Sequence, residues 1–138
     1  MTIQEYVDQL NLRYKAGISR EHSYRGDLQT LLSSLLPDLL ITNEPSRTDV
    51  GAPDYILTKG KIPVGYIEAK DIGDPDLEGK KKNKEQFERY KTGLPNLIFT
   101  DYLDFRVYRD GEFLTSVAIA EIVGVILRIV VGIHAVKF

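Results

Sequence analysis

Two acidic residues and one lysine stand at a spacing that could support chemistry. Asp54 opens an alternating apolar run, Glu68 and Lys70 close the next one, and a Lys-Gly-Lys turn lies between them. A tight turn centred near Gly60 pairs the two runs as a β-hairpin, with residues whose numbers sum to about 120–122 facing each other. This register places Asp54 opposite positions 66–68. Asp54 and Glu68 are therefore predicted to be neighbours.

Side chains alternate along a strand, so Glu68 and Lys70 share one face of the predicted hairpin. Two carboxylates held close together repel each other unless a proton or a cation intervenes, and oxygen ligands suit a hard ion such as Mg²⁺. Lys70 beside that ion could orient a water and stabilise developing negative charge. Glu21 lies on the apolar stripe of the preceding predicted helix. Three acids and a lysine suffice for metal-assisted hydrolysis of a phosphodiester.

The composition of the 138-residue chain excludes most other catalytic chemistry. It contains no cysteine, which excludes thiolate metal sites and cysteine nucleophiles, and its two histidines, His22 and His134, lie far apart in the sequence. The net charge of −2 gives the whole chain no attraction for a polyanion, so any nucleic-acid site must be a local patch.

The surrounding sequence predicts helices and strands in a defined order. Thr2 and Glu5 have the spacing of a capping box, and Ser19 is placed to cap a second helix whose apolar stripe ends before Pro37. The predicted elements are a helix at 3–15, the second helix, strands at 39–44, 54–58 and 62–70, a polar loop at 71–83, a helix at 84–92, and strands at 96–100, 105–108 and 112–117. This order predicts an α/β fold in which a mixed sheet is flanked by helices.

The Pro53-Asp54 pair, followed after thirteen residues by Glu68-Ala69-Lys70, resembles the signature of the PD-(D/E)xK nuclease superfamily. The common core of that superfamily, with a restriction-endonuclease-like order of helix, three-stranded antiparallel meander, helix and strand, matches residues 20–100. Further runs resemble the N-terminal nuclease domain of restriction-modification proteins that are fused to N6-adenine DNA methyltransferases: EHSYR at 21–25, NEP at 43–45, GAPDY at 51–55, GYIEAKD at 65–71, EQFERY at 85–90 and LIFTDY at 97–102.

The resemblance implies a role for each matching residue. Asp54 and Glu68 resemble the metal ligands, joined by the backbone carbonyl of Ala69, and Glu21 matches an acid from the first core helix that reaches a metal or its water. Lys70 resembles the lysine that positions the attacking water. Gln86 and Tyr90 are similar to a Gln-x-x-x-Tyr motif that contacts the DNA backbone or braces the lysine. The implied reaction is Mg²⁺-dependent cleavage of DNA, with Mn²⁺ as a substitute ion, leaving a 5′-phosphate and a 3′-hydroxyl.

A lysine-rich segment directly follows the predicted site. Positions 78–91 carry an excess of three positive charges, and Lys82, Lys84 and Arg89 are the candidates for contacts to DNA phosphates. Such a run is also typical of an ordinary solvated loop and helix face. For Tyr90 the ordinary alternative is a place in the core, with Gln86 on the solvent side.

We expect one nuclease domain over residues 1–138, with a core at 19–112 and an apolar tail at 117–138 of open role: a buried strand, a core helix, an oligomer contact or, less favoured, a membrane segment. No signal peptide or methyltransferase motif is evident, so we expect a cytoplasmic protein that acts on DNA.

Two alternatives stay open: a non-cutting or partner-dependent DNA-binding subunit, with a separate methyltransferase or specificity subunit, and a resolvase-like homodimer that acts on branched DNA.

Overall fold

The N-terminal helix is fixed by the capping residues that the sequence indicates. The computed structural model of the protein describes residues 1–17, 21–43 and 45–130. Helix α1 spans Ile3–Ala16, and both halves of the capping box form: the Thr2 hydroxyl accepts from the Glu5 amide, and the Glu5 carboxylate accepts from the Thr2 amide. Gly17 ends the helix in the left-handed conformation at φ 74°.

The second helix begins later than predicted. A 3-10 turn, η1, occupies Glu21–Tyr24, and helix α2 spans Arg25–Leu35. The predicted cap at Ser19 lies outside the described residues. Glu21 therefore belongs to the turn that leads into the helix rather than to the helix itself. The first part of the apolar stripe is confirmed, because Tyr24, Leu28 and Leu31 are buried. Its last part is wrong, because Leu35 and Leu36 are exposed at the end of the helix.

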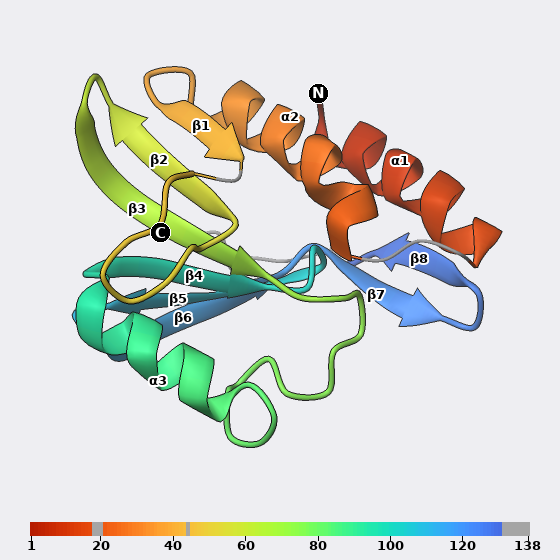
Figure 1. Cartoon of the computed structure of the whole chain (residues 1–138). Coiled ribbons are helices and arrows are strands. Elements are labelled where there is room, and N and C mark those ends of the chain that lie inside the picture. The colour runs from red at the N-terminus through yellow and green to blue at the C-terminus, as the bar shows by residue number, and fades with distance from the viewer. Residues whose placement is uncertain (18–20, 44, 131–138) are drawn as a thin grey trace.

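A six-stranded mixed sheet forms the centre of the molecule, as predicted (Figure 1). The strands follow one another across the sheet in sequence order, and only the pair β3 and β4 is parallel. Their bounds are β1 Leu40–Asn43, β2 Tyr55–Lys59, β3 Ile62–Ala69, β4 Asn96–Thr100, β5 Asp104–Arg109 and β6 Glu112–Ala118. Together with α2 and α3, the first four strands give the predicted order of helix, antiparallel meander, helix and strand.

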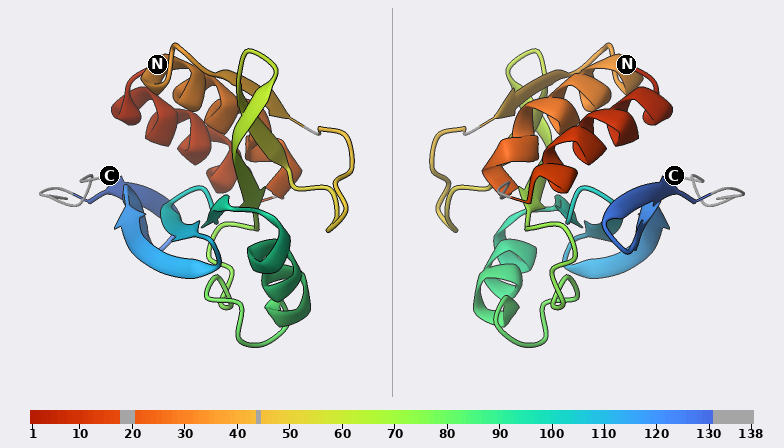
Figure 2. Two further views of the ribbon diagram at one scale, coloured as in Figure 1. Left: turned by 90° about the vertical axis from the view of Figure 1, so that its left-hand side faces the viewer. Right: turned by 90° about the vertical axis from the view of Figure 1, so that its right-hand side faces the viewer.

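The helices cover the two faces of this sheet separately. Helix α3, which spans Lys84–Gly93, lies on one side, and α1 and α2 lie together on the other (Figure 2). The core on the α3 side is aromatic: the Phe87 ring stacks on the Phe99 ring with centroids 3.6 Å apart, and Tyr108 meets Phe99 edge-on. The core on the other side is built around buried tyrosines, among them Tyr6, Tyr24, Tyr55 and Tyr102.

The described part of the apolar tail folds back onto the N-terminal helix. Strands β7 (Ala120–Val123) and β8 (Ile126–Ile129) form a separate antiparallel hairpin. Leu127 is buried, and its amide and carbonyl both bond to the side chain of Asn11 in α1. Ala120 and Leu127 therefore join the core on the side of α1, whereas Ile122, Val123, Val125 and Ile126 of the same hairpin are exposed. Residues 131–138 of the predicted tail lie outside the described residues.

No described helix is long and apolar enough to cross a membrane.

Candidate functional site

The pairing of β2 with β3 brings Asp54 and Glu68 together, as the spacing predicts. Tyr55 faces Ile67 across the hairpin, and continuing this register by one residue places Asp54 opposite Glu68. Asp54 Oδ2 also accepts a hydrogen bond of 2.8 Å from the Ala69 amide. Both carboxylates are more than nine-tenths buried. The sheet therefore holds two acidic side chains close together where water can solvate their charges only in part.

A basic residue that the sequence did not single out neutralises one of these acids. Arg25 opens α2, and its guanidinium donates a short hydrogen bond to Asp54 Oδ1 in a buried ion pair. The hydroxyl of Tyr55 donates to the Arg25 carbonyl at 2.9 Å. Arg25 ends the run EHSYR, so the sequence contained a pointer to this residue. An arginine at the start of a helix is ordinarily exposed, however, and nothing in the pattern indicated that it would be buried.

Lys70 lies beside Glu68 and is held from the neighbouring helix. Its Nζ is 3.6 Å from Glu68 Oε2 and donates a hydrogen bond of 2.6 Å to Gln86 Oε1. Tyr90 follows Gln86 by one helical turn on α3. Burial, with Glu68 acting in the same direction, raises the pKa of Tyr90 above its ordinary value. Of this i, i+4 pair, Gln86 is the residue that bonds the lysine.

The base of the site is apolar. The Lys70 ammonium lies 5.7 Å from the centroid of the fully buried Phe87 ring. Tyr90 is buried in the same cluster, which confirms its ordinary interpretation as a core residue, whereas Gln86 faces the lysine rather than open solvent. A lysine above an aromatic ring, with its ammonium bonded on one side, retains hydrogen-bond donors for a further partner.

The remaining predicted ligands lie close by in the chain. Ala69 is buried as the last residue of β3, so its backbone lies between Glu68 and Lys70. Glu21 begins the turn η1 that leads into Arg25, and its side chain is outside what the structure describes. Within the described residues, no three histidine, cysteine, aspartate or glutamate side chains form a metal cluster. The described acidic side chains of the site are therefore Asp54 and Glu68.

The lysine-rich segment is an ordered loop with internal ion pairs. Lys82 Nζ lies 3.0 Å from Asp74 Oδ2, and Arg89 bonds both to the Val50 carbonyl and to Glu85. Lys84 is exposed at the start of α3. Of the three predicted phosphate contacts, two are thus already bonded within the protein, and all three are exposed, in α3 or in the loop before it.

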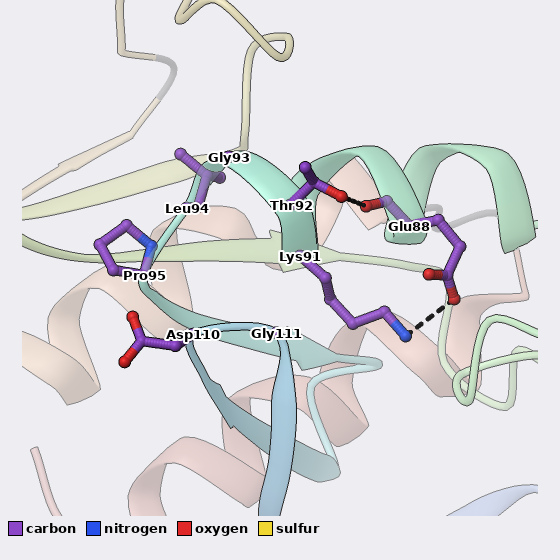
Figure 3. A pocket seen from close by; sticks show the side chains of 8 residues that line it. All are labelled: Glu88, Lys91, Thr92, Gly93, Leu94, Pro95, Asp110 and Gly111. Atoms are coloured by element: carbon purple, nitrogen blue, oxygen red, sulfur yellow. Dashed lines mark hydrogen bonds and ion pairs between the residues drawn. The ribbon is translucent and has the colours of Figure 1, made fainter.

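Cavities in the described part of the protein lie away from the paired acids. One, of about 410 Å³, lies at the C-terminal end of α3, lined by Glu88, Lys91, Thr92, Gly93, Leu94, Pro95, Asp110 and Gly111 (Figure 3). None of the predicted site residues lines it. Another, of about 430 Å³, includes Asp71 and Ile72, directly after Lys70, together with Tyr14, Lys15, Gly17, Tyr24, Gly124 and Val125.

Comparison with known proteins finds a similarity to a solved protein–DNA complex. No protein-family model matches the sequence, and no curated protein matches it. The structure is similar to a chain of the DrdV–DNA complex solved by cryo-electron microscopy, with a TM-score of 0.64 and 25% sequence identity over 86% of this chain. This protein spans 12% of the length of that chain. The mixed α/β fold thus resembles part of a much larger protein that was solved with DNA.

Proposed function

We propose that this protein is a Mg²⁺-dependent DNA endonuclease of the PD-(D/E)xK type with a restriction-endonuclease-like core. The observation that carries the proposal is the meeting of Asp54, Glu68 and Lys70 at one end of the β2–β3 hairpin. The similarity to a chain of the DrdV–DNA complex supports DNA as the substrate. We place the activity in restriction-modification or DNA defence in the cytoplasm, beside a separate methyltransferase or specificity subunit.

The donors of the site fit a hard divalent cation. Asp54 and Glu68 supply carboxylate oxygens, the Ala69 carbonyl supplies a neutral one, and Glu21 is the proposed fourth ligand. All the proposed ligand atoms are oxygens, so Mg²⁺ and Mn²⁺ are favoured over softer ions. When bound, such an ion stabilises negative charge on a phosphate oxygen and lowers the pKa of a bound water.

The protein's own groups orient the reactants. The backbone amide of Ala69 fixes one oxygen of Asp54, and Arg25 fixes the other. Lys70 is positioned by Gln86 to hold a water through its ammonium and to stabilise charge on the cleaved phosphate. Lys82, Lys84 and Arg89 are proposed to contact the flanking phosphates, which makes binding weaken with salt.

A cleavage assay tests this proposal. Purified protein is incubated with supercoiled plasmid and with single-stranded DNA in Mg²⁺, Mn²⁺ or EDTA, next to Lys70→Ala and Asp54→Ala. We expect cleavage in Mg²⁺ and Mn²⁺, none in EDTA, and a loss of about 10³-fold or more in both variants. Equal nicking by the wild type and both variants would mean that the activity comes from elsewhere.

The same assay separates the two alternatives. Binding of DNA without cleavage, restored by a partner fraction, would support a partner-dependent subunit instead. Preferential cleavage of a four-way junction by a protein that is dimeric in light scattering would support the resolvase-like alternative. Deletion of residues 117–138, which would otherwise test dimerisation, removes buried Leu127 and is unsuitable for that purpose.

A further inference from the structure

Arg25 is the described cation in direct contact with Asp54, and both residues are buried, with 8% of each exposed. A guanidinium at this place does two things. It fixes Oδ1 of the carboxylate, while the Ala69 amide fixes Oδ2, and it adds a positive charge next to the proposed ligands. Because Arg25 is buried, its guanidinium stays next to Asp54, where it both orients the carboxylate and adds a positive charge to the site.

A buried tyrosine holds the backbone of Arg25. The Tyr55 hydroxyl donates to the Arg25 carbonyl at 2.9 Å, and Tyr55 itself is fully buried. Tyr102 lies in the same core, where its carbonyl accepts a hydrogen bond of 2.8 Å from the Tyr6 hydroxyl of α1. Arg25 is therefore bonded at its carbonyl and at its guanidinium by groups that are themselves buried. The fold therefore fixes the position of Arg25 next to Asp54.

The charge of the described site depends on this residue. Asp54 and Glu68 contribute two negative charges, and Arg25 and Lys70 contribute two positive ones, so the four described side chains sum to zero. Without Arg25 the sum is −1. A divalent cation that approaches Asp54 must share this carboxylate with the guanidinium, and the two positive charges repel each other.

We propose that Arg25 is a positioning residue that orients the Asp54 carboxylate and competes for it with the divalent cation. This inference rests on the proposed function of the site. The inference predicts two effects of the Arg25 side chain: it lowers the affinity of the protein for the cation alone, and it raises the rate of cleavage. A residue with a merely structural role would change both quantities in the same direction.

The test measures binding of Mn²⁺ alone, from the electron paramagnetic resonance signal of the free ion, and cleavage of plasmid at saturating Mn²⁺. We expect Arg25→Gln to bind Mn²⁺ about fivefold or more tightly than the wild type. We expect its cleavage rate to fall about tenfold or more, because Asp54 loses its orientation. Arg25→Lys keeps the charge but not the planar donor group, so we expect tightening of less than about twofold together with slower cleavage.

Arg13→Gln is the matched control. Arg13 of α1 forms an arginine–aspartate pair with Asp27 of α2 at 2.9 Å, and its side chain is far more exposed than that of Arg25. We expect this variant to bind Mn²⁺ and to cleave like the wild type.

The outcomes separate this inference from the proposed function. Absence of Mn²⁺ binding by the wild type would overturn the proposed function and the inference together. Binding by the wild type with equal or weaker binding by folded Arg25→Gln would overturn the role of Arg25 alone. If Arg25→Gln does not fold, Arg25→Lys decides: slower cleavage with unweakened Mn²⁺ binding supports the proposal, and weaker binding contradicts it.

Discussion

Two pairs of acids in this protein differ in what surrounds them. Asp74 and Asp76 lie two residues apart in the loop between β3 and α3, whereas Asp54 and Glu68 lie fourteen residues apart and meet because β2 pairs with β3. All four are acids in a region rich in glycine and lysine. The comparison shows how their partners distinguish a structural acid from one that is available for chemistry.

The loop acids are used by the backbone around them. Asp76 accepts hydrogen bonds from the amides of Lys80, Lys81 and Asn83 at 2.7–2.9 Å. Burial works to raise the pKa of Asp76, but these amides outweigh it and hold the pKa below its ordinary value. Asp74 accepts from the Asp76 amide and the Asn83 side chain. Their function is to shape the loop.

The strand acids are held in place by groups from distant parts of the chain. Asp54 is bonded to Arg25 of α2, and Glu68 lies next to Lys70, two residues later, whose ammonium is held by Gln86 of α3. A loop can organise itself through local backbone amides, but only a complete fold can assemble these side chains. Acids whose cationic partners are positioned by other elements are the better candidates for a catalytic site.

The largest expected effect of a single substitution comes from Glu68→Gln. The amide retains the size of the side chain and removes the negative charge, so we expect cleavage to fall about 10³-fold or more. Circular dichroism should show an unchanged folded state. A variant that cleaves within about threefold of the wild type would remove Glu68 from the proposed site.

Phe87 packs against both the loop before α3 and Lys70 of the proposed site, so its removal should destabilise both regions. The ring stacks on Phe99, lies beneath Lys70, and leaves no room for a side chain at Gly79 of the loop. We expect Phe87→Ala to lower the free energy of unfolding by about 3–5 kcal/mol, as measured by urea denaturation. A loss below about 1 kcal/mol would show that the aromatic core is not packed as described.

Alkaline pH should weaken the tyrosine side of the core behind Arg25. Burial raises the pKa of Tyr6, Tyr55 and Tyr102 well above the ordinary value of 10.0. Above about pH 10 the unfolded chain releases these protons while the folded chain keeps them, so stability falls by up to about 1.4 kcal/mol per pH unit for each tyrosine. Urea denaturation at pH 9 to 11, with phenolate absorbance, measures this; phenolate signal from all eight tyrosines before unfolding would contradict it.

The smallest expected effect distinguishes two neighbouring lysines. Lys82 is paired with Asp74, whereas Lys84 makes no ion pair within the described part of the chain. If Lys84 contacts a phosphate, Lys84→Ala should lower the slope of log affinity against log salt by about 0.9. Lys82→Ala is the comparison, with a smaller change because Asp74 competes for that ammonium. Equal slopes for Lys84→Ala and the wild type would exclude the contact.

The sequence predicted most of the helices and strands. It predicted that Asp54 lies near Glu68 but not that Arg25 pairs with Asp54. Alternation and the short turn predicted that Asp54 would lie opposite positions 66–68. The exact pairing with Glu68 depends on a one-residue shift of the β2–β3 register between Leu57 and Thr58, which the sequence pattern did not indicate. The start of α2 did not, because its cap falls at a turn of 3-10 type that periodicity does not distinguish from an α-helix. The ion pair of Arg25 with Asp54 depends on how α2 packs against the sheet, which no spacing encodes. The apolar tail was uninformative for the same reason, since its hairpin is defined by its contact with Asn11 in α1.

The most direct test of the central claim compares the two acid pairs in one assay. The rate of Mg²⁺-dependent plasmid nicking is measured for Asp54→Asn and Asp76→Asn, normalised to the folded fraction of each protein. We predict that Asp54→Asn loses about 10³-fold or more. We predict that Asp76→Asn lowers the thermal unfolding midpoint but cleaves within about threefold of the wild type per folded molecule. Equal losses in both variants, or full activity in Asp54→Asn, would contradict the assignment of the site to the paired strands.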